Sequence, residues 1–327
     1  MQASQSSCVV PSELQLDVIE FLHDDEQALR NCSLVCKSWA DCSRSHLWEK
    51  TAVIFKDEAG TVSENHSALV DREDVAYFFR AASMEDATAF FTANPTVAKL
   101  IKKFRIDGFT GVTVHALSSL LTALPNLAHL EIIHANFPAP TEPISDLDRA
   151  RLVIQPVYTH RLDHVFFYRC NIVERDVDTL LRVLGLFSSI DTLKFVGEVN
   201  TIRDMQIERW SFDPATHLRQ DVPHPPQPEV RHLIPEMVHA TILAYLVNET
   251  KLARNLKDLT LYPTNVWTYD DLKYVARALL PAVGGTLDIF HFVPSPCVGS
   301  TLPKTAEEHR DVDEGELSIR LPVTPRI

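Results

Sequence analysis

Glycine is scarce in this chain, with nine residues among 327. Loops that bind phosphate need glycine where the backbone must approach the ligand closely. The sequence contains neither Gly-x-Gly-x-x-Gly nor Gly-x-x-x-x-Gly-Lys-Ser/Thr, and it has no Gly-x-Ser-x-Gly nucleophile elbow. The sequence therefore gives no indication of a nucleotide-binding loop or of a hydrolase nucleophile.

Positive charge is limited and dispersed. The 31 Lys and Arg residues are outnumbered by 44 Asp and Glu residues, which gives a formal net charge of −13. The densest basic group is Lys102, Lys103 and Arg105. An acidic chain is poorly suited to binding a phosphate backbone, so we expect no nucleic-acid partner.

Long apolar runs and a cysteine framework are also missing. The most apolar candidate helix, Met237–Val247, has about half the length needed to cross a bilayer. Met1–Ser7 lacks the basic-then-apolar order of a secretory signal. The cysteines show no disulfide pattern; they are Cys8, Cys32, Cys36, Cys42, Cys170 and Cys297. We expect an intracellular protein, cytoplasmic or nuclear, with reduced thiols and no membrane partner.

The N-terminal stretch carries an ordered set of apolar residues. Pro11 leads into a helix expected over Ser12–Leu22 and capped by Ser12, and a second helix begins near Asp25. The run Leu34-Val35-Cys36-Lys37-Ser38-Trp39 precedes a third helix, expected over Cys36–Ser45, and Leu47-Trp48 closes the unit. Three short helices cannot bury all these apolar groups among themselves, so the surplus must face the rest of the chain or a partner.

This order of residues resembles an F-box, and the resemblance covers roughly Val10–Phe55. The one departure is Val10-Pro11, where the motif usually opens with Leu-Pro. The resemblance implies docking onto the Skp adaptor of a cullin-based, SCF-type ubiquitin ligase. It assigns the adaptor contact and the core beneath it to Pro11, Leu14, Ile19, Leu22, Leu34, Val35, Cys36, Lys37, Trp39, Leu47 and Trp48.

Within that set, Lys37 would lie near the rim, where it could meet an acidic adaptor surface. The alternative interpretation of the same residues is an ordinary three-helix cap that packs entirely on its own chain, because apolar stripes are usually core.

The rest of the chain repeats a short apolar pattern of the form Φ-x-x-Φ-x-Φ, where Φ is apolar. The last two members of each triplet are two residues apart and so share one face of a short strand. Their first members are 26, 35, 28, 66 and 31 residues apart. The six triplets are Ile101/Phe104/Ile106, Leu127/Leu130/Ile132, Leu162/Val165/Phe167, Ile190/Leu193/Phe195, Leu256/Leu259/Leu261 and Leu287/Phe290/Phe292.

Amphipathic helices are expected between the strands, over Thr113–Leu124, over Arg175–Leu184 and from Thr268 to a stop at Pro281. The third triplet continues to Cys170 and Ile172, and this pattern resembles a leucine-rich repeat, whose Cys or Asn satisfies backbone groups in the turn after the strand. The alternative is a general α/β domain with a parallel sheet.

Several further elements are expected outside the triplets. Thr51–Phe55 is expected to be a strand, and two helices should follow at Asp71–Arg80 and Ser83–Ala93. The 66-residue gap is expected to hold a proline-rich loop at Ser211–Pro228 and then a helix at Pro235–Asn248.

The expected fold class is therefore α/β, with an N-terminal three-helix F-box-like unit followed by an irregular leucine-rich-repeat-like strand/helix solenoid. Its expected divisions are a disordered N-terminus (1–9), the F-box-like domain (10–55), the repeat domain (56–293) with the insertion near 211–228, and an acidic tail (294–327). Within that tail, Leu317–Leu321 is a candidate edge strand.

Metal and catalytic groups are weakly indicated. Cys32, Cys36 and Cys42 could bind zinc with His23 or His46, but the spacing is not that of a zinc site, and buried thiols are the better interpretation. Four histidines near the insertion are expected to be solvated loop residues; they are His217, His224, His232 and His239. We expect no cofactor and no catalytic residue.

The function that the sequence favours is a non-catalytic substrate receptor, which docks on the Skp adaptor and through it on a cullin. Its repeat domain would hold a protein substrate that the sequence does not identify. One alternative is an interaction scaffold outside ligases. A second alternative is a hydrolase or metalloenzyme on an α/β scaffold.

Overall fold

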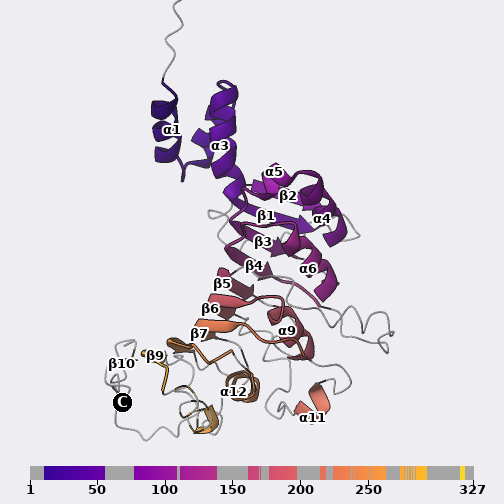
Figure 1. Ribbon diagram of the computed structural model, residues 1–327, viewed down its shortest axis with the longest axis vertical. Helices are drawn as coiled ribbons and strands as arrows, with labels where there is room; N and C mark the ends of the chain where they lie inside the picture. Colours follow the sequence, from indigo (N-terminus) through magenta and orange to yellow (C-terminus); the bar gives the residue numbers. More distant parts are fainter. Residues whose placement is uncertain are drawn as a thin grey trace, which may run out of the picture.

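The computed structural model describes residues 11–55, 77–108, 111–137, 161–168, 170, 177–196, 214–218, 224–236, 238, 240–250, 252–262, 285–292 and 317–320, with 273–275, 277, 279, 281 and 283. Three helices form the N-terminal unit, namely α1 (Ser12–Phe21), α2 (Glu26–Cys32) and α3 (Lys37–Glu49). Figure 1 shows them at one end of the molecule, beyond the β1–β2 end of a long sheet. The three-helix unit and the sheet are therefore consecutive parts of an elongated chain.

The described strands form one ten-stranded sheet in the order β10-β9-β8-β7-β6-β5-β4-β3-β1-β2. Neighbouring strands are parallel from β2 through to β9, and only β10 runs antiparallel to its neighbour. The strands are β1 (Lys50–Phe55), β2 (Tyr77–Ala81), β3 (Lys103–Asp107), β4 (His129–Ile133), β5 (Arg161–Tyr168), β6 (Ser189–Val196), β7 (Glu229–Pro235), β8 (Asp258–Leu261), β9 (Ile289–Phe292) and β10 (Leu317–Arg320).

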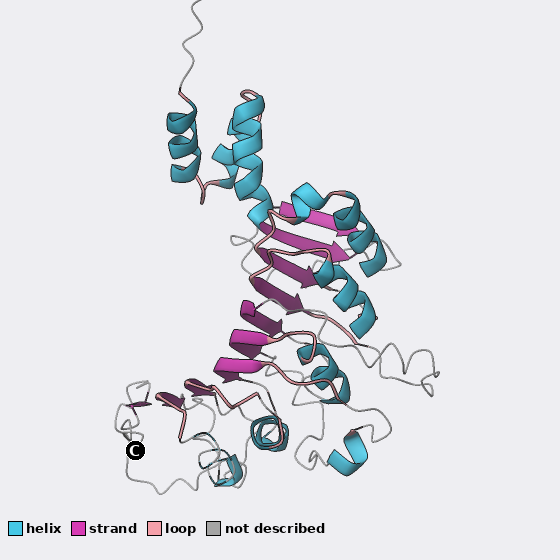
Figure 2. Cartoon of the chain, in the orientation of Figure 1, coloured by secondary structure: helices cyan, strands magenta, loops and turns pink. Residues whose placement is uncertain are grey.

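Helices follow one side of this sheet, as Figure 2 shows. The described helices after α3 are α4 (Met84–Ala93), α5 (Pro95–Ala98), α6 (Val114–Thr122), α9 (Val177–Leu184), α11 (Pro214–His217) and α12 (Ala240–Asn248). The predicted helix starts at Ser83 and Thr113 are confirmed, because each side chain accepts a hydrogen bond from the backbone N–H three residues later. Local capping therefore begins these helices where the sequence indicated.

The apolar triplets pack between the sheet and the helices, where all of their residues except the partly buried Phe290 and Phe292 belong to the core. Their middle residues pair across neighbouring strands, from Phe104 to Leu130, Val165 and Leu193 and onward to Leu259 and Phe290. Their third residues pair in the same way, as with Phe167 and Phe195, whose rings stack 5.3 Å apart. Each predicted strand thus places its apolar face in register with the next one.

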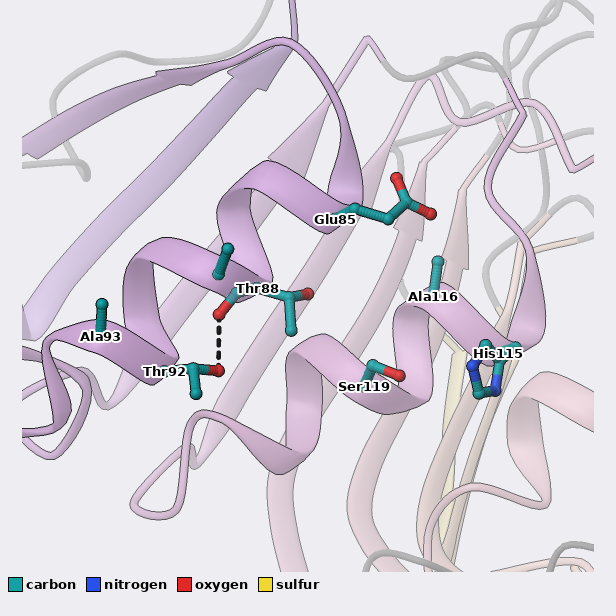
Figure 3. Close-up of a pocket in the computed structure, with 8 residues that line it drawn as sticks. Glu85, Thr88, Thr92, Ala93, His115, Ala116 and Ser119 are labelled. Atoms are coloured by element: carbon teal, nitrogen blue, oxygen red, sulfur yellow. Dashed lines mark hydrogen bonds between the residues drawn. The ribbon is translucent and has the colours of Figure 1, made fainter.

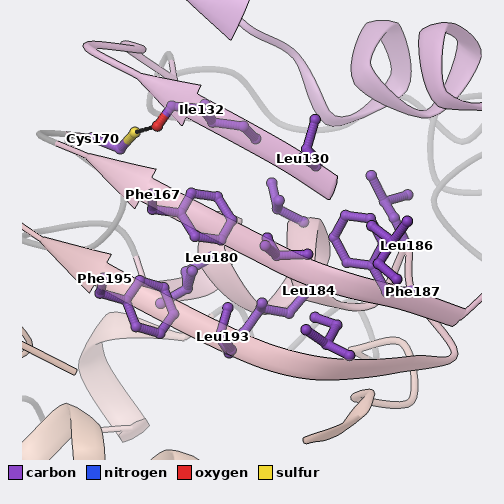
Figure 4. Packing of buried hydrophobic residues seen from close by; sticks show 14 of the residues in the cluster. Leu130, Ile132, Phe167, Cys170, Leu180, Leu184, Leu186, Phe187, Leu193 and Phe195 are labelled. Carbon is purple, nitrogen blue, oxygen red and sulfur yellow. Dashed lines mark hydrogen bonds between the residues drawn. The ribbon is translucent and has the colours of Figure 1, made fainter. Parts of the chain in front are cut away.

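Cys170 closes the turn after β5. Its buried side chain donates to the backbone carbonyl of Ile132 at 3.2 Å, on the neighbouring strand β4. Figure 4 shows this contact beside Phe167 and the leucines of α9. The thiol therefore links the segment after β5 to the backbone of the neighbouring strand β4, whereas the resemblance to a leucine-rich repeat implied a contact to backbone groups of the turn itself.

The prediction for the 66-residue gap was wrong in two respects, because α11 lies within the loop expected at Ser211–Pro228 and a strand precedes the expected helix. β7 occupies residues 229–235 within this gap and pairs with both β6 and β8. Its apolar residues are Val230 and Leu233, and Pro235 stands at the third position of a seventh triplet. Pro235 therefore ends a strand instead of starting a helix, and α12 begins only at Ala240.

Two other predicted helices differ from the structure. Residues 77–80, expected to end a helix, belong to the edge strand β2, while 71–76 lie outside the described residues. The helix expected from Thr268 does not stop at Pro281, because positions 281 and 283 are still helical; Thr268 itself lies outside the description. The strands predicted at 51–55 and 317–321 are confirmed as β1 and β10.

Among the described helices, none is both long enough and apolar enough to cross a bilayer.

Candidate docking surface

The helices of the N-terminal unit begin and end for local reasons. Asp25 caps α2, because its carboxylate accepts a hydrogen bond from the Ala28 N–H at 2.8 Å. The expected cap of α1 by Ser12 is not formed, since the N-cap residue is Pro11 and no side chain caps this end. α3 is longer than predicted, and it continues through Leu47 and Trp48 to Glu49.

The three helices share a small core that is separate from the core of the sheet. It consists of four buried residues, which are Ile19, Leu29, Cys32 and Leu47. Leu22, Trp39 and Cys42 are partly buried against them. Ile19 is the one buried side chain among the described side chains of α1. This helix therefore buries little of its surface against α2 and α3.

The remaining apolar residues of this unit face solvent. Among the described residues of the whole chain, seven large hydrophobic side chains are exposed, and six of them lie between positions 14 and 35. They form what we call the apolar docking surface, defined as Leu14, Leu16, Val18, Phe21, Leu34 and Val35. Phe21 is 85% exposed and Leu34 is 84% exposed. Burying one such side chain contributes about 1.5–3 kcal/mol, so this surface favours a partner.

The predicted site residues divide into three groups in the structure. Pro11, Leu14, Leu34, Val35, Cys36 and Lys37 are exposed. Ile19 and Leu47 are buried and, with the partly buried Leu22 and Trp39, support the exposed group from below. Trp48 is half-buried and stacks on Phe90 of α4 with ring centroids 6.3 Å apart, so it contacts the sheet domain.

Leu16, Val18 and Phe21 were not predicted as surface residues. The sequence pattern predicted that Leu14, Val18, Ile19 and Leu22 share one helical stripe. In the structure Ile19 and Leu22 turn toward the small core, whereas Val18 is 42% exposed. The spacing of Leu14, Val18 and Phe21 at i, i+4 and i+7 could have indicated a second stripe on α1.

Cys36 stands within this surface as the N-cap residue of α3. Hydrogen bonds from the Ser38 side chain and from the Trp39 backbone lower the pKa of the Cys36 thiol. The Sγ lies 3.3 Å from the Ser38 Oγ. Ser38 also donates to Gln15 of α1 at 2.8 Å, which links the start of α3 to α1.

The helical unit is joined directly to the sheet. α3 ends at Glu49 and β1 begins at Lys50. The Glu49 carbonyl accepts a backbone hydrogen bond from Lys102 at 3.1 Å, and Thr51 Oγ1 donates to the Trp48 carbonyl at 2.8 Å. Together with the Trp48–Phe90 stack, these contacts set the direction in which the docking surface faces relative to the sheet.

Comparison with known protein families gives a match at the N-terminal end of the chain. Residues 8–52 match the family model described as F-box-like. Comparisons with curated proteins and with solved structures gave no match. The chain therefore carries an F-box-like domain, which is a protein-interaction domain that generally binds Skp adaptors.

The metal-binding groups and histidines considered from the sequence do not form a second site among the described residues. The described residues hold no group of three or more His, Cys, Asp or Glu side chains placed to bind a metal ion. The histidines predicted to be solvated are in part engaged, since His224 contacts Asp178 at 2.8 Å and His232 of β7 contacts Asp258 at 3.0 Å. His217 lies in α11, and His239 lies outside the described residues.

A groove with a cavity volume of about 530 Å³ lies between α4 and α6, and Figure 3 shows its lining. Its walls are mainly small side chains, such as Thr88, Ala89, Thr92, Ala116 and Ser119, with Glu85 and His115 beside them. Small side chains between two helices are typical of close helix packing, so the groove does not by itself indicate a ligand.

Proposed function

We propose that this protein is a substrate receptor of an SCF-type ubiquitin ligase. The observation that supports this most strongly is the concentration of exposed apolar side chains on the F-box-like domain, where six of the seven exposed large hydrophobics of the described chain lie. In this proposal the apolar docking surface contacts the Skp adaptor, and the adaptor links the chain to a cullin.

The chemistry of this contact is burial of apolar surface around a few anchors. Phe21 on α1 and Leu34 in the turn before α3 are almost fully exposed. They would enter pockets of the adaptor as central anchors. Lys37 lies exposed at the start of α3, at the rim, where a charge affects association rate and orientation more than affinity.

The sheet domain is proposed to be a leucine-rich-repeat-like solenoid that holds the protein substrate. The in-register ladder of apolar triplets and the Cys170 contact in the turn after β5 support this interpretation. Stacked units of this kind leave an extended surface that suits protein recognition. The receptor needs no catalytic residue, because it contributes proximity between the substrate and the ubiquitin-transfer machinery.

A non-ligase scaffold with the same F-box-like domain is the second candidate, because the F-box-like match concerns adaptor binding alone. Both candidates predict adaptor binding. Only the ligase predicts that a cullin is retained through the adaptor and that a bound protein is ubiquitinated.

The deciding experiment immobilises the full chain with purified Skp adaptor and adds a cullin. Retention of the cullin by wild type, and its loss in a folded Phe21→Asp/Leu34→Asp variant, is the result that the proposal predicts. Adaptor binding with no cullin retained would support the scaffold and contradict the ligase.

A further inference from the structure

The sheet face opposite the helices carries charges that are largely neutralised. Side chains alternate along a strand, so the residues between the buried triplet members lie on this face. Glu131 lies 2.8 Å from the Lys103 Nζ and 2.5 Å from the Arg105 Nε. A second carboxylate contacts two arginines from the strands on either side; these residues are Asp191, Arg161 and Arg231. Among the described residues of this face, little free positive charge remains.

Lys194 of β6 differs from these cations. Among the described residues, no carboxylate lies within ion-pair distance of its ammonium group. Its Nζ lies over the Phe166 ring, 5.5 Å from the centroid. Phe166 and Ile234 flank it in register on β5 and β7. The half-buried side chains around it form what we call the central face patch, defined as Phe166, Tyr168, Lys194, Val196, Ile234 and Glu236.

The patch combines apolar surface with one accessible positive charge. A half-buried ammonium group loses part of its hydration shell. A ligand carboxylate that accepts a hydrogen bond from it in these apolar surroundings compensates for that loss. Glu236 at the edge of the patch disfavours the binding of a segment that carries a run of acidic groups. The paired lysine and arginine residues near the patch leave little positive charge to attract a polyanion such as nucleic acid.

We propose that the central face patch binds an extended protein segment in which a single acidic side chain neighbours an aromatic or aliphatic one. The acidic side chain contacts Lys194, and the apolar side chain packs on Phe166 or Ile234. Phe166 and Ile234 lie two strand spacings apart, about 10 Å, which about three extended residues can span. This inference rests on the proposed function, for which it names the chemistry of the substrate segment.

The test selects a random-sequence peptide display library on the immobilised full chain. The selection is repeated on Lys194→Glu and on Lys99→Glu, which makes the same charge change at an exposed lysine outside the patch. Lys194→Gln removes the charge with little change of shape, and circular dichroism checks that each variant is folded.

The expected result is enrichment of acidic–apolar peptides on wild type and on Lys99→Glu. A synthetic peptide from that set should lose about tenfold or more in affinity for Lys194→Gln and Lys194→Glu. The same peptide with its acidic residue changed to Lys should bind Lys194→Glu better than wild type.

Three results would overturn the inference, namely no enrichment on wild type, equal binding by Lys194→Glu, or displacement of the peptide by a single-stranded oligonucleotide. Skp adaptor binding is measured on the same preparations. If the wild-type chain does not bind the adaptor but still selects acidic–apolar peptides, the proposed function alone is overturned. If the chain binds the adaptor but the Lys194 variants bind the selected peptides as well as wild type does, this inference alone is overturned.

Discussion

At the scale of single residues, the proposed interactions depend on side chains whose exposure or pKa is set by the surrounding structure. Phe21 and Leu34 are apolar and almost fully exposed, Cys36 has a lowered thiol pKa, and Glu236 is a half-buried carboxylate. None of these properties follows from residue type, because each depends on which neighbours the fold supplies.

Cys36 is predicted to be the most rapidly alkylated of Cys32, Cys36, Cys42 and Cys170. It is exposed, and its lowered pKa increases the thiolate fraction near neutral pH. Mass spectrometry after brief iodoacetamide treatment measures the order of modification. Ser38→Ala removes the largest cause of the lowered pKa of Cys36 and should move the alkylation profile to higher pH.

Bound Skp adaptor is also expected to protect Cys36 from alkylation. Alkylation of Cys36 at an unchanged rate in the complex would contradict its placement in the interface.

Glu236 is predicted to make stability depend on pH. Burial raises its pKa, and the positive charge of Lys194 only partly opposes this. A raised folded-state pKa favours folding at pH below the ordinary value of 4.5, and this contribution is lost as pH rises through the folded-state pKa. Glu236→Gln should therefore raise the free energy of unfolding at pH 7, by less than about 1 kcal/mol because solvent screens a half-buried carboxylate.

Urea denaturation of wild type and Glu236→Gln at pH 7 and pH 4 measures this effect. The gain should shrink at pH 4, where the wild-type carboxyl group is largely protonated. A gain of equal size at both pH values would show that burial of the charge is not its cause.

At the scale of elements, α9 and the segment before β7 are held together by a close contact. A Cβ added at Gly185 would lie 2.1 Å from the Pro225 Cγ. Gln227 donates to the Leu181 carbonyl at 2.9 Å, and His224 contacts Asp178 of the same helix. Residues 224–228, the described end of the predicted proline-rich loop, therefore pack on α9 without helix or strand.

Gly185→Ala is predicted to destabilise the chain by about 1–3 kcal/mol, since either the helix end or the proline ring must move. Gly285→Ala is the matched control, because nothing lies within 4 Å of a Cβ added there. Thermal unfolding of both variants measures the difference. Equal midpoints would contradict the close contact between α9 and Pro225.

Much of the sheet could be predicted from apolar spacing, because five of the six triplets are buried along successive strands, and in the sixth Phe290 and Phe292 pack partly buried against the same core. β7 was missed because Pro235 replaces the third apolar residue, and proline before an apolar run resembles a helix start. β2 was missed because Tyr77–Ala81 pairs at the edge of the sheet, a tertiary contact that overrides local helical periodicity. The exposed face of α1 was assigned only in part, since periodicity identifies apolar stripes but not which stripe the small core selects.

At the scale of the whole molecule, the chain joins two surfaces through a direct junction. The apolar docking surface lies on α1 and the segment before α3, and the central face patch lies on and beside β5, β6 and β7; Figure 1 shows where these elements lie in the molecule. The Trp48–Phe90 stack and the Glu49–Lys102 hydrogen bond connect the two parts. In the proposed ligase, this junction would hold a bound substrate in a defined direction relative to the adaptor.

The most direct test of the account is the dissociation constant between the full chain and purified Skp adaptor. Phe21→Asp/Leu34→Asp changes two exposed anchors, and Tyr274→Asp is the control, because Tyr274 is the seventh exposed large hydrophobic side chain of the described residues and is 46% exposed. We predict tight binding by wild type and by Tyr274→Asp, and a loss of about 100-fold or more for the double variant with its thermal unfolding unchanged. Failure of wild type to bind, or equal binding by the double variant, would contradict the assignment of this surface to the adaptor.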